Sequence, residues 1–344
     1  MTPNLDARSA RHCRDERSRY SRAVSGSVPL DRSTTWPYAD GEPGPFSYAR
    51  FSSPTVAAAE DALGELDGGE ALLFASGAAA STAVVLALLS PGQTVAVAEG
   101  AYYGTAVLLD ELERWGLKQK GFDQTGPPPP DADLVWIEAP SNPYLTMPNF
   151  EAAAAHPAPV VCDSTAATPL HVRPLERGCE IALHSATKGL AGHDDALVGA
   201  LVIRDPKTAA RLREFRSRTG PVAAPDVAWL LLRGLQTLEV RVARQTKTAK
   251  AIAESLRGHP AVELVRYPGF GCLLSFDVAD AAAARQVETS TRLIANESSL
   301  GGVTSRIEAR SRWEGTRVPA GLLRLSLGLE DPADLWDDLS QALS

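Results

Sequence analysis

The stretch LHSATKGLAGHDDALVGALVIRD, residues 183–205, places one lysine between a Ser/Thr pair and a glycine-rich turn, directly before an apolar run. The titratable residues nearest to Lys188 are His184, His193 and the Asp194–Asp195 pair. A lysine on a solvated surface usually stands in a more charged neighbourhood. The pattern therefore raises the hypothesis that Lys188 has a chemical role, and the rest of the chain has to support it.

The length and composition are those of a globular protein. The chain has 344 residues, of which 44% are hydrophobic and 22% charged. Because this length exceeds what one hydrophobic core usually serves, we expect two domains. The net charge of −8 argues against nucleic acid or an anionic membrane as a partner, since both require a dominant basic surface. No apolar run approaches the length of a membrane span.

The cysteines and the first residues indicate a compartment. Cys13, Cys162, Cys179 and Cys272 are scattered, with no CxxC pair. This spacing fits a reducing compartment, which we expect to be the cytoplasm, and it predicts neither a disulfide framework nor a metal site. Residues 1–22 are rich in arginine but lack the apolar core of a secretory signal. We interpret them as a solvated arm or one that clasps a second subunit.

Hydrophobic periodicity predicts two kinds of architecture along the chain. Between residues 55 and 205 helical and strand-like patterns alternate, and the strand-length apolar runs fall at 94–99, 133–140, 159–165 and 180–188. Such runs between helices predict parallel strands that are buried on both faces. Residues 225–257 predict a long helical stretch with a break near Gly234, and an α+β pattern follows. The fold class is therefore α/β with a smaller C-terminal α+β domain.

Polar residues follow several of these runs, at the edge where ligands of parallel α/β sheets bind. They are Glu138, Asn142, Asp163, Thr165, Ser185, Thr187 and Lys188. Gly77, in FASGAAA, opens a predicted helix whose free N–H groups could hold a phosphate. Pyridoxal phosphate needs this combination: a lysine for its Schiff base, an acid for its ring nitrogen and an anion cradle for its phosphate.

The chain resembles the Cys/Met-metabolism (trans-sulfuration) enzymes, which depend on pyridoxal phosphate, from about Ser25 to Leu343. The resemblance rests on matched blocks in family order, namely YARFSSPT (48–55), FASGAAA (74–80), YYGT (102–105), EAPSNP (138–143), CDSTAATP (162–169), SATKGLAGHDD (185–195), LLLRGLQTLEVR (230–241), SLGGV (299–303) and LRLSLGLED (323–331). It implies the fold-type I architecture of aspartate aminotransferase. The expected divisions are an arm at 1–50, a cofactor-binding large domain with a mainly parallel sheet at 51–225, and a small domain at 226–344.

The resemblance also implies roles for residues. Lys188 would form the Schiff base and move protons, Asp163 would pair with the pyridinium nitrogen, and Tyr102 would stack on the ring. Asn142 would bind the ring hydroxyl. The other implied contacts to the cofactor come from Gly77, Ala78, Thr165, Ser185 and Thr187, and from Tyr48 and Arg50 of a neighbouring subunit. The residues implied to bind the substrate are Arg324, Ser299 and Ser298.

One region departs from the family pattern. Only 25 residues separate Ser299 from Arg324, fewer than in the better-known members, and ARSRWEGTRVP (309–319) replaces the usual segment. Ser298 stands where family members that act on cystathionine usually have glutamate. A neutral serine cannot pair with the distal ammonium group, which predicts modest discrimination for cystathionine unless the replaced segment reads that group.

The implied activity is that of a carbon–sulfur lyase, with cystathionine γ-lyase as the leading hypothesis. Cystathionine γ-synthase, methionine γ-lyase and a β-eliminating C–S lyase remain as alternatives, and a catalytically silent binding protein is a more remote one. The resemblance also implies a homo-oligomer, a dimer with shared sites that pairs into a tetramer.

Overall fold

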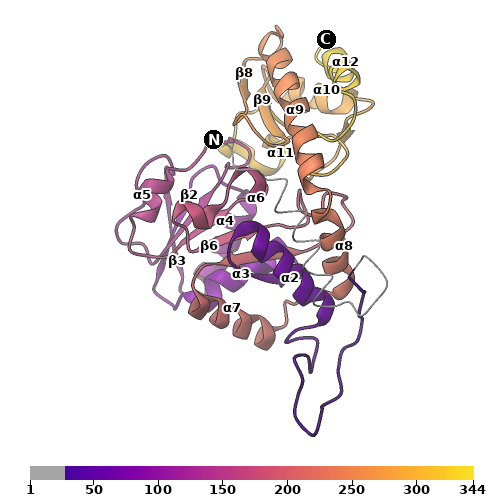
Figure 1. Cartoon of the computed structure of the whole chain (residues 1–344). Helices are drawn as coiled ribbons and strands as arrows, with labels where there is room; N and C mark the ends of the chain where they lie inside the picture. The colour runs from indigo at the N-terminus through magenta and orange to yellow at the C-terminus, as the bar shows by residue number, and fades with distance from the viewer. Residues whose placement is uncertain (1–27) are drawn as a thin grey trace.

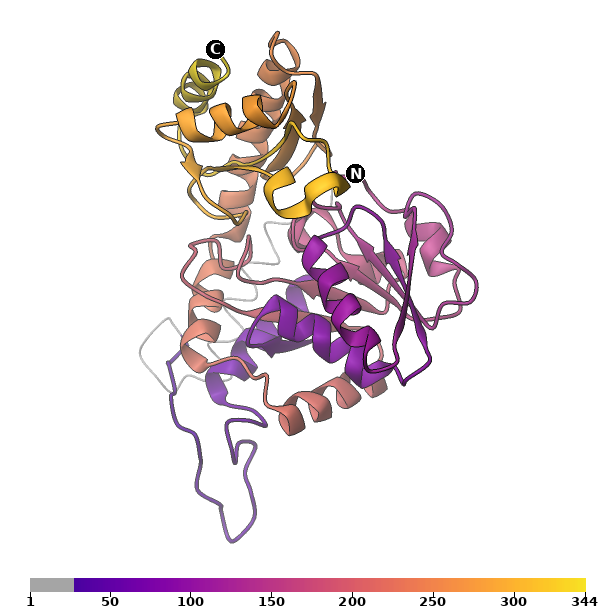
Figure 2. The same ribbon diagram turned by 180° about the vertical axis from the view of Figure 1, so that it is seen from behind.

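The computed structural model describes residues 28–344. The arginine-rich stretch at 1–22 and Cys13 lie outside the described residues, so the interpretation of that stretch as an arm stays a prediction. Among residues 28–344 there are two sheets, one in each half of the chain, and a pair of helices connects them (Figures 1 and 2).

The larger sheet has the strand order β1-β7-β6-β5-β4-β2-β3. Its strands are β1 (Glu70–Phe74), β2 (Thr94–Ala98), β3 (Lys118–Phe122), β4 (Leu134–Glu138), β5 (Val160–Asp163), β6 (Ile181–His184) and β7 (Gly199–Ile203). The pairs from β6 through β3 are parallel, whereas β7 is antiparallel to both β6 and β1. The prediction of a mainly parallel sheet is confirmed, and β7 is the exception within it.

Helices cover both faces of this sheet, as the apolar runs predicted. On one face lie α2 (Pro54–Asp67) and α8 (Pro225–Leu235); on the other lie α3 (Gly77–Leu88), α4 (Tyr103–Glu113) and α7 (Pro206–Thr219). The remaining short helices of this half are α5 (Phe150–Ala154), α6 (Thr168–His171) and the 3₁₀ turn η1 (Pro174–Arg177). The strands are buried on both sides, apart from the edge strand β3, whose sequence KQKGF carries no apolar run and escaped prediction.

The second sheet has five strands in the order β10-β11-β12-β9-β8. They are β8 (Leu264–Arg266), β9 (Leu273–Asp277), β10 (Ala295–Asn296), β11 (Arg306–Ala309) and β12 (Leu322–Ser326). Its helices are α9 (Leu238–Arg257), α10 (Ala281–Ser290), α11 (Ser311–Glu314) with the 3₁₀ turn η2 (Gly315–Arg317), and α12 (Pro332–Ala342). We keep the division of the chain at residues 50 and 225 as a proposal.

The helical stretch predicted at 225–257 is broken, with α8 ending at Leu235 and α9 starting at Leu238. Residues on either side of this break hold the loop that follows Lys188 in place. Arg241 at the start of α9 is buried, and its guanidinium donates to the carbonyls of Gly189, Leu190 and Gly234 at 2.8, 3.2 and 2.8 Å. Burial lowers the pKa of Arg241 to about 10. The guanidinium therefore stays charged at neutral pH while it holds this loop.

The structure also bears on the cysteines and on the predicted lack of a membrane span. Cys162, Cys179 and Cys272 are free and buried. Within residues 28–344, no helix combines the length and the apolar character that a membrane span requires.

The contact between α8 and the loop after Lys188 leaves no room for a side chain at Gly234. A Cβ there would lie 2.4 Å from the Ala191 carbonyl oxygen and 2.8 Å from that of Leu190. We predict that Gly234→Ala lowers the thermal unfolding midpoint by roughly 1–4 °C, because such overpacking costs about 1–3 kcal/mol and a chain of this length loses about 1.4 °C per kcal/mol. Gly258→Ala is the control, since its Cβ would meet only the Ser255 oxygen at 3.6 Å. Equal midpoints for the two variants in calorimetry would show that α8 does not press on this loop.

Candidate functional site

The carboxyl ends of β4, β5 and β6 lie side by side and carry the predicted acids. In the sheet register Glu138 pairs with Asp163, and Asp163 pairs with Leu183. Parallel pairing therefore brings residues that are 25 positions apart in the sequence to one edge of the sheet. Lys188 follows in the turn after β6.

A cavity of about 320 Å³ opens at this edge. It has the size of a small-molecule site. The predicted site residues that line it are Gly77, Ala78, Tyr102, Asn142, Asp163, Thr165, Ser185, Thr187, Lys188, Ser298, Ser299 and Arg324. Two predicted residues, Tyr48 and Arg50, are not among its lining.

The Asp163 carboxyl is buried, and within the described residues no ion pair satisfies it. Its Oδ1 accepts hydrogen bonds from the Thr165 N–H at 3.0 Å and from the Thr165 hydroxyl at 2.5 Å. Burial raises the pKa of Asp163, and the bonds from Thr165 partly offset this effect. The Glu138 carboxyl lies near it, so burial and the Asp163 charge raise the pKa of Glu138 well above its usual range. A cation or a strong N–H donor in the cavity would stabilise Asp163.

The Lys188 amine is largely buried and donates to the Ser299 hydroxyl at 2.7 Å. Burial lowers the pKa of Lys188 to about 8, and the nearby Arg324 charge adds to this, while Asp194 acts against it. Ser299 has φ = +104°, a left-handed conformation that is uncommon for a residue with a side chain. Such backbone strain often accompanies a functional position. Ser299 thus connects the lysine to the second sheet.

The start of α3 forms a cradle suited to an anion. Ser76 caps the helix by accepting from the Ala79 N–H at 3.1 Å, and the backbones of Gly77 and Ala78 line the cavity. The first N–H groups of a helix have no partner within the helix and attract negative charge. A Cβ at Gly77 would lie 2.9 Å from the Ser185 Cβ, so glycine allows Ser185 to lie against the helix start.

Two predicted residues also have structural roles. The Thr187 hydroxyl donates to the Val198 carbonyl at 3.1 Å and accepts from the Val198 N–H at 2.9 Å, which ties the Lys188 turn to β7. The Tyr102 N–H donates to Glu138 at 2.6 Å, which fixes the start of α4 against β4. The Tyr102 side chain remains 41% exposed at the cavity.

Arg324 on β12 is buried and reaches across to the larger sheet. Its guanidinium donates to Asn142 Oδ1 at 3.3 Å, to the Ser299 carbonyl at 3.2 Å and to the Glu308 carboxylate at 2.8 Å. Burial and the charge of Arg310 lower the pKa of Arg324 to about 10, so it remains a cation at neutral pH. Arg324 therefore lies within reach of the same serine that contacts Lys188.

Sequence reasoning missed the ion pairs behind Arg324. Glu308 also accepts from Arg310 at 2.6 Å, and Arg310 pairs with Glu314 at 2.8 Å. Arg310 lines the cavity. The only sequence signal is that these residues lie in and beside the unusual 309–319 segment; the pairing of Glu308 with Arg324 arises from the β11–β12 register.

Tyr48 and Arg50 belong to the segment that precedes α2, part of which projects from the body of the chain (Figure 1). Arg50 donates to the Ser217 carbonyl and lies over the Tyr48 ring, which is 42% exposed. Within the single chain these two residues do not join the cavity. Their predicted contact with a neighbouring subunit's site stays a prediction.

Comparisons with known proteins agree with this geometry. The family model for the "Cys/Met metabolism PLP-dependent enzyme" matches residues 10–344. A putative cystathionine gamma-lyase of Streptomyces coelicolor is 39% identical over 88% of this chain and 85% of its own length. A cystathionine gamma-synthase of Mycobacterium bovis is 36% identical over 92% of both chains. The structure of "cystathione gamma lyase (CalE6)" from Micromonospora echinospora superposes with a TM-score of 0.90 at 36% identity, covering 98% of each chain.

The environment of Lys188 predicts an amine that becomes reactive at lower pH than an ordinary lysine. In protein freed of cofactor, labelling of Lys188 by an amine-specific reagent should rise with pH around a midpoint of about 8. The same peptide in urea-unfolded protein should titrate near the usual value of about 10.4. Peptide mass spectrometry over a pH series measures both midpoints. Coincident midpoints would contradict the proposed effect of burial.

Proposed function

The chain belongs to the family of Cys/Met-metabolism enzymes that depend on pyridoxal phosphate, and on this premise we propose that it is a cystathionine γ-lyase. The reaction would consume one water and release cysteine, 2-oxobutanoate and ammonia. The relative named putative cystathionine gamma-lyase, 39% identical, supports this choice within the family. The family itself includes lyases and synthases, so the choice between them needs an experiment.

The residues of the cavity fit the cofactor. The buried Asp163 carboxylate lacks the cation that a protonated pyridine nitrogen provides. The Gly77 and Ala78 N–H groups with Ser185 suit the phosphate, and the Lys188 amine suits the carbonyl group. Asn142, Thr165 and Thr187 would hold the ring and its surroundings, and Tyr102 would cover one ring face. When bound, pyridoxal phosphate supplies an electron sink for the charge that develops at the substrate Cα.

The observation that carries the proposal is the arrangement of Lys188, Ser299 and Arg324. The Lys188 amine lies 2.7 Å from the Ser299 hydroxyl, and the Ser299 carbonyl accepts from Arg324 at 3.2 Å. Arg324 would hold the α-carboxylate as a charge-assisted fork, with Ser299 beside it. This would place the Cα–H bond next to an amine whose lowered pKa suits it as a general base at neutral pH.

Elimination needs proton transfers at two positions of the substrate. We propose that Lys188 takes a proton from Cα and, after giving that proton up, takes a second one from Cβ; the Cγ–S bond then breaks, and the sulfur gains a proton and leaves as the thiol of cysteine. Within residues 28–344 the Lys188 amine forms no salt bridge and its hydrogen-bond partner is Ser299, which leaves it able to exchange protons. Tyr102 would assist at the leaving sulfur.

The proposal includes assembly and location. Because Tyr48 and Arg50 lie outside their own chain's cavity, we propose that they complete the site of a neighbouring subunit in a dimer, and that dimers pair into tetramers. We also propose a cytoplasmic enzyme, in keeping with the free thiols of Cys162, Cys179 and Cys272.

A product screen of the purified holoprotein tests the function. Cystathionine should give cysteine and 2-oxobutanoate in equal amounts, whereas a synthase would consume an O-acylated homoserine and cysteine without forming 2-oxobutanoate. Methionine, homocysteine and cysteine complete the panel. The Lys188→Ala variant should lose turnover by several orders of magnitude, because the nucleophile and the proton carrier disappear together. Full activity in that variant would refute the proposed chemistry, and pyruvate from cystathionine would indicate β-elimination instead.

A further inference from the structure

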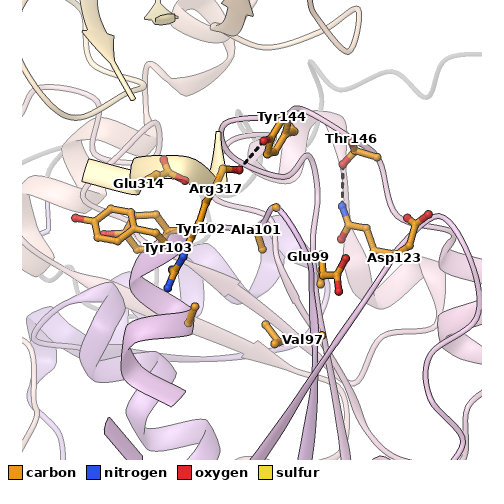
Figure 3. A pocket seen from close by; sticks show the side chains of 15 residues that line it. Val97, Glu99, Ala101, Tyr102, Tyr103, Asp123, Tyr144, Thr146, Glu314 and Arg317 are labelled. Carbon is orange, nitrogen blue, oxygen red and sulfur yellow. Dashed lines mark hydrogen bonds between the residues drawn. The ribbon is translucent and has the colours of Figure 1, made fainter. Parts of the chain in front are cut away.

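A second cavity of about 570 Å³, which we call the outer pocket, adjoins the candidate site. It lies between the end of β2, the start of α4, the loop after β3 and the 311–317 segment (Figure 3). Tyr102 and Tyr103 line both cavities, so this aromatic pair stands between them. A substrate held at Lys188 could therefore extend into the outer pocket.

The lining of the outer pocket combines an apolar floor with charges of both signs. Val97, Ala98 and Ala101 form part of the floor. Its carboxylates are Glu99, Asp123 and Glu314, and Arg317 is the guanidinium that lines it. A pocket whose lining combines apolar side chains with an acid and a base suits an amphoteric group attached to an uncharged chain.

Glu314 has an oxygen to offer to a ligand. Its side chain is only 5% exposed, and both contacts from Arg310 end on Oε1, from Nε at 2.9 Å and from Nη2 at 2.8 Å. Oε2 accepts no hydrogen bond from residues 28–344. Glu314 Oε2 can therefore accept a hydrogen bond from a ligand in the pocket, and an ammonium group would pair with it.

The backbone of Arg317 is held in place, whereas its side chain is able to bind a ligand. Its carbonyl accepts from the Tyr144 hydroxyl at 2.7 Å, which holds the 311–317 segment over the pocket. Its side chain extends towards Tyr102 and Tyr103 (Figure 3). Among the residues that the structure describes, its guanidinium has no ion-pair partner, so it is free to bind a carboxylate as a fork.

Ser298, the position expected to contact the distal ammonium group, carries no charge. The neighbouring Glu297 pairs with Arg306 at 3.2 Å. The outer pocket, in contrast, connects to the clamp for the α-carboxylate. A chain of ion pairs runs from Arg324 through Glu308 and Arg310 to Glu314, with contacts of 2.8, 2.6 and 2.8 Å.

We propose that the outer pocket binds the distal end of a two-ended thioether, meaning a thioether with an α-amino acid group at each end. Glu314 binds the distal ammonium and Arg317 binds the distal carboxylate, while Arg324 holds the reacting end. This assignment rests on the proposed carbon–sulfur lyase function and specifies its substrate class. It locates selectivity in the 309–319 segment of this chain.

The Arg317→Gln variant tests the assignment. We compare kcat/KM for cystathionine with kcat/KM for S-propyl-homocysteine, which lacks the distal charges. Loss of one charge-assisted fork should reduce the ratio of the two values about tenfold. Arg317→Lys should restore some of the lost ratio. Arg312→Gln is the matched control, because Arg312 lies on the same segment but pairs with Glu288 and lines neither cavity.

Equilibrium binding separates recognition from turnover. In the Lys188→Ala background with pyridoxal phosphate added, Arg317→Gln should weaken calorimetric binding of cystathionine about tenfold and leave binding of S-propyl-homocysteine in place. An unchanged ratio, or equal loss for both compounds, would overturn the outer-pocket assignment while leaving the lyase function intact. Failure of the unmodified enzyme to cleave any thioether would instead refute the proposed function.

Discussion

The candidate site depends on the burial of two ionisable groups, the Lys188 amine and the Asp163 carboxyl, in one cavity without an ion pair between them. Burial disfavours the charged form of each, so the pKa of Lys188 falls and that of Asp163 rises. The cofactor of this family has what both groups lack, a carbonyl for the amine and a basic ring nitrogen for the acid. The protein alone holds these groups in an unfavourable setting, and the bound cofactor would relieve it.

The surrounding fold is built to maintain that setting. Asp163 is held at the end of a buried parallel strand, and the turn that carries Lys188 is fixed by Thr187 on one side and Arg241 on the other. Arg324 comes from the second sheet and Ser299 from the loop between β10 and β11, so the site needs both halves of the chain. Ion pairs behind Arg324 keep its guanidinium oriented. Because a buried ion pair contributes little net stability, we interpret this network as one that positions groups.

Much of this could be predicted from the sequence. Strand-length apolar runs located β2, β4, β5 and β6, and their carboxyl ends located the acids and the lysine, because ligands of parallel sheets gather there. The edge strand β3 could not be found, since its exposed residues carry no apolar period. Glu308, Arg310 and Glu314 could not be found either. Their ion pairs with Arg324 and with one another depend on the β11–β12 register and on the short helix α11, and the charged stretch ARSRWEG gives no helical pattern from which α11 could be predicted.

Substrate choice is the property that the sequence described least well. The neutral side chain of Ser298, at the one position expected to face the distal group, predicted weak discrimination for cystathionine. The structure adds a cavity on the far side of the Tyr102–Tyr103 pair, lined by residues that are distant in the sequence. Substrate selectivity in this chain would therefore depend on the 309–319 segment as well as on Ser298.

The most direct test of the account is to identify the lysine that carries the cofactor. Holoprotein reduced with borohydride and digested should yield one modified peptide, in which Lys188 carries the reduced pyridoxal phosphate mass. Borohydride treatment of protein freed of cofactor provides the control. Modification at a different lysine, or no modification in protein that contains the cofactor, would contradict the assignment of Lys188 and of the site built around it.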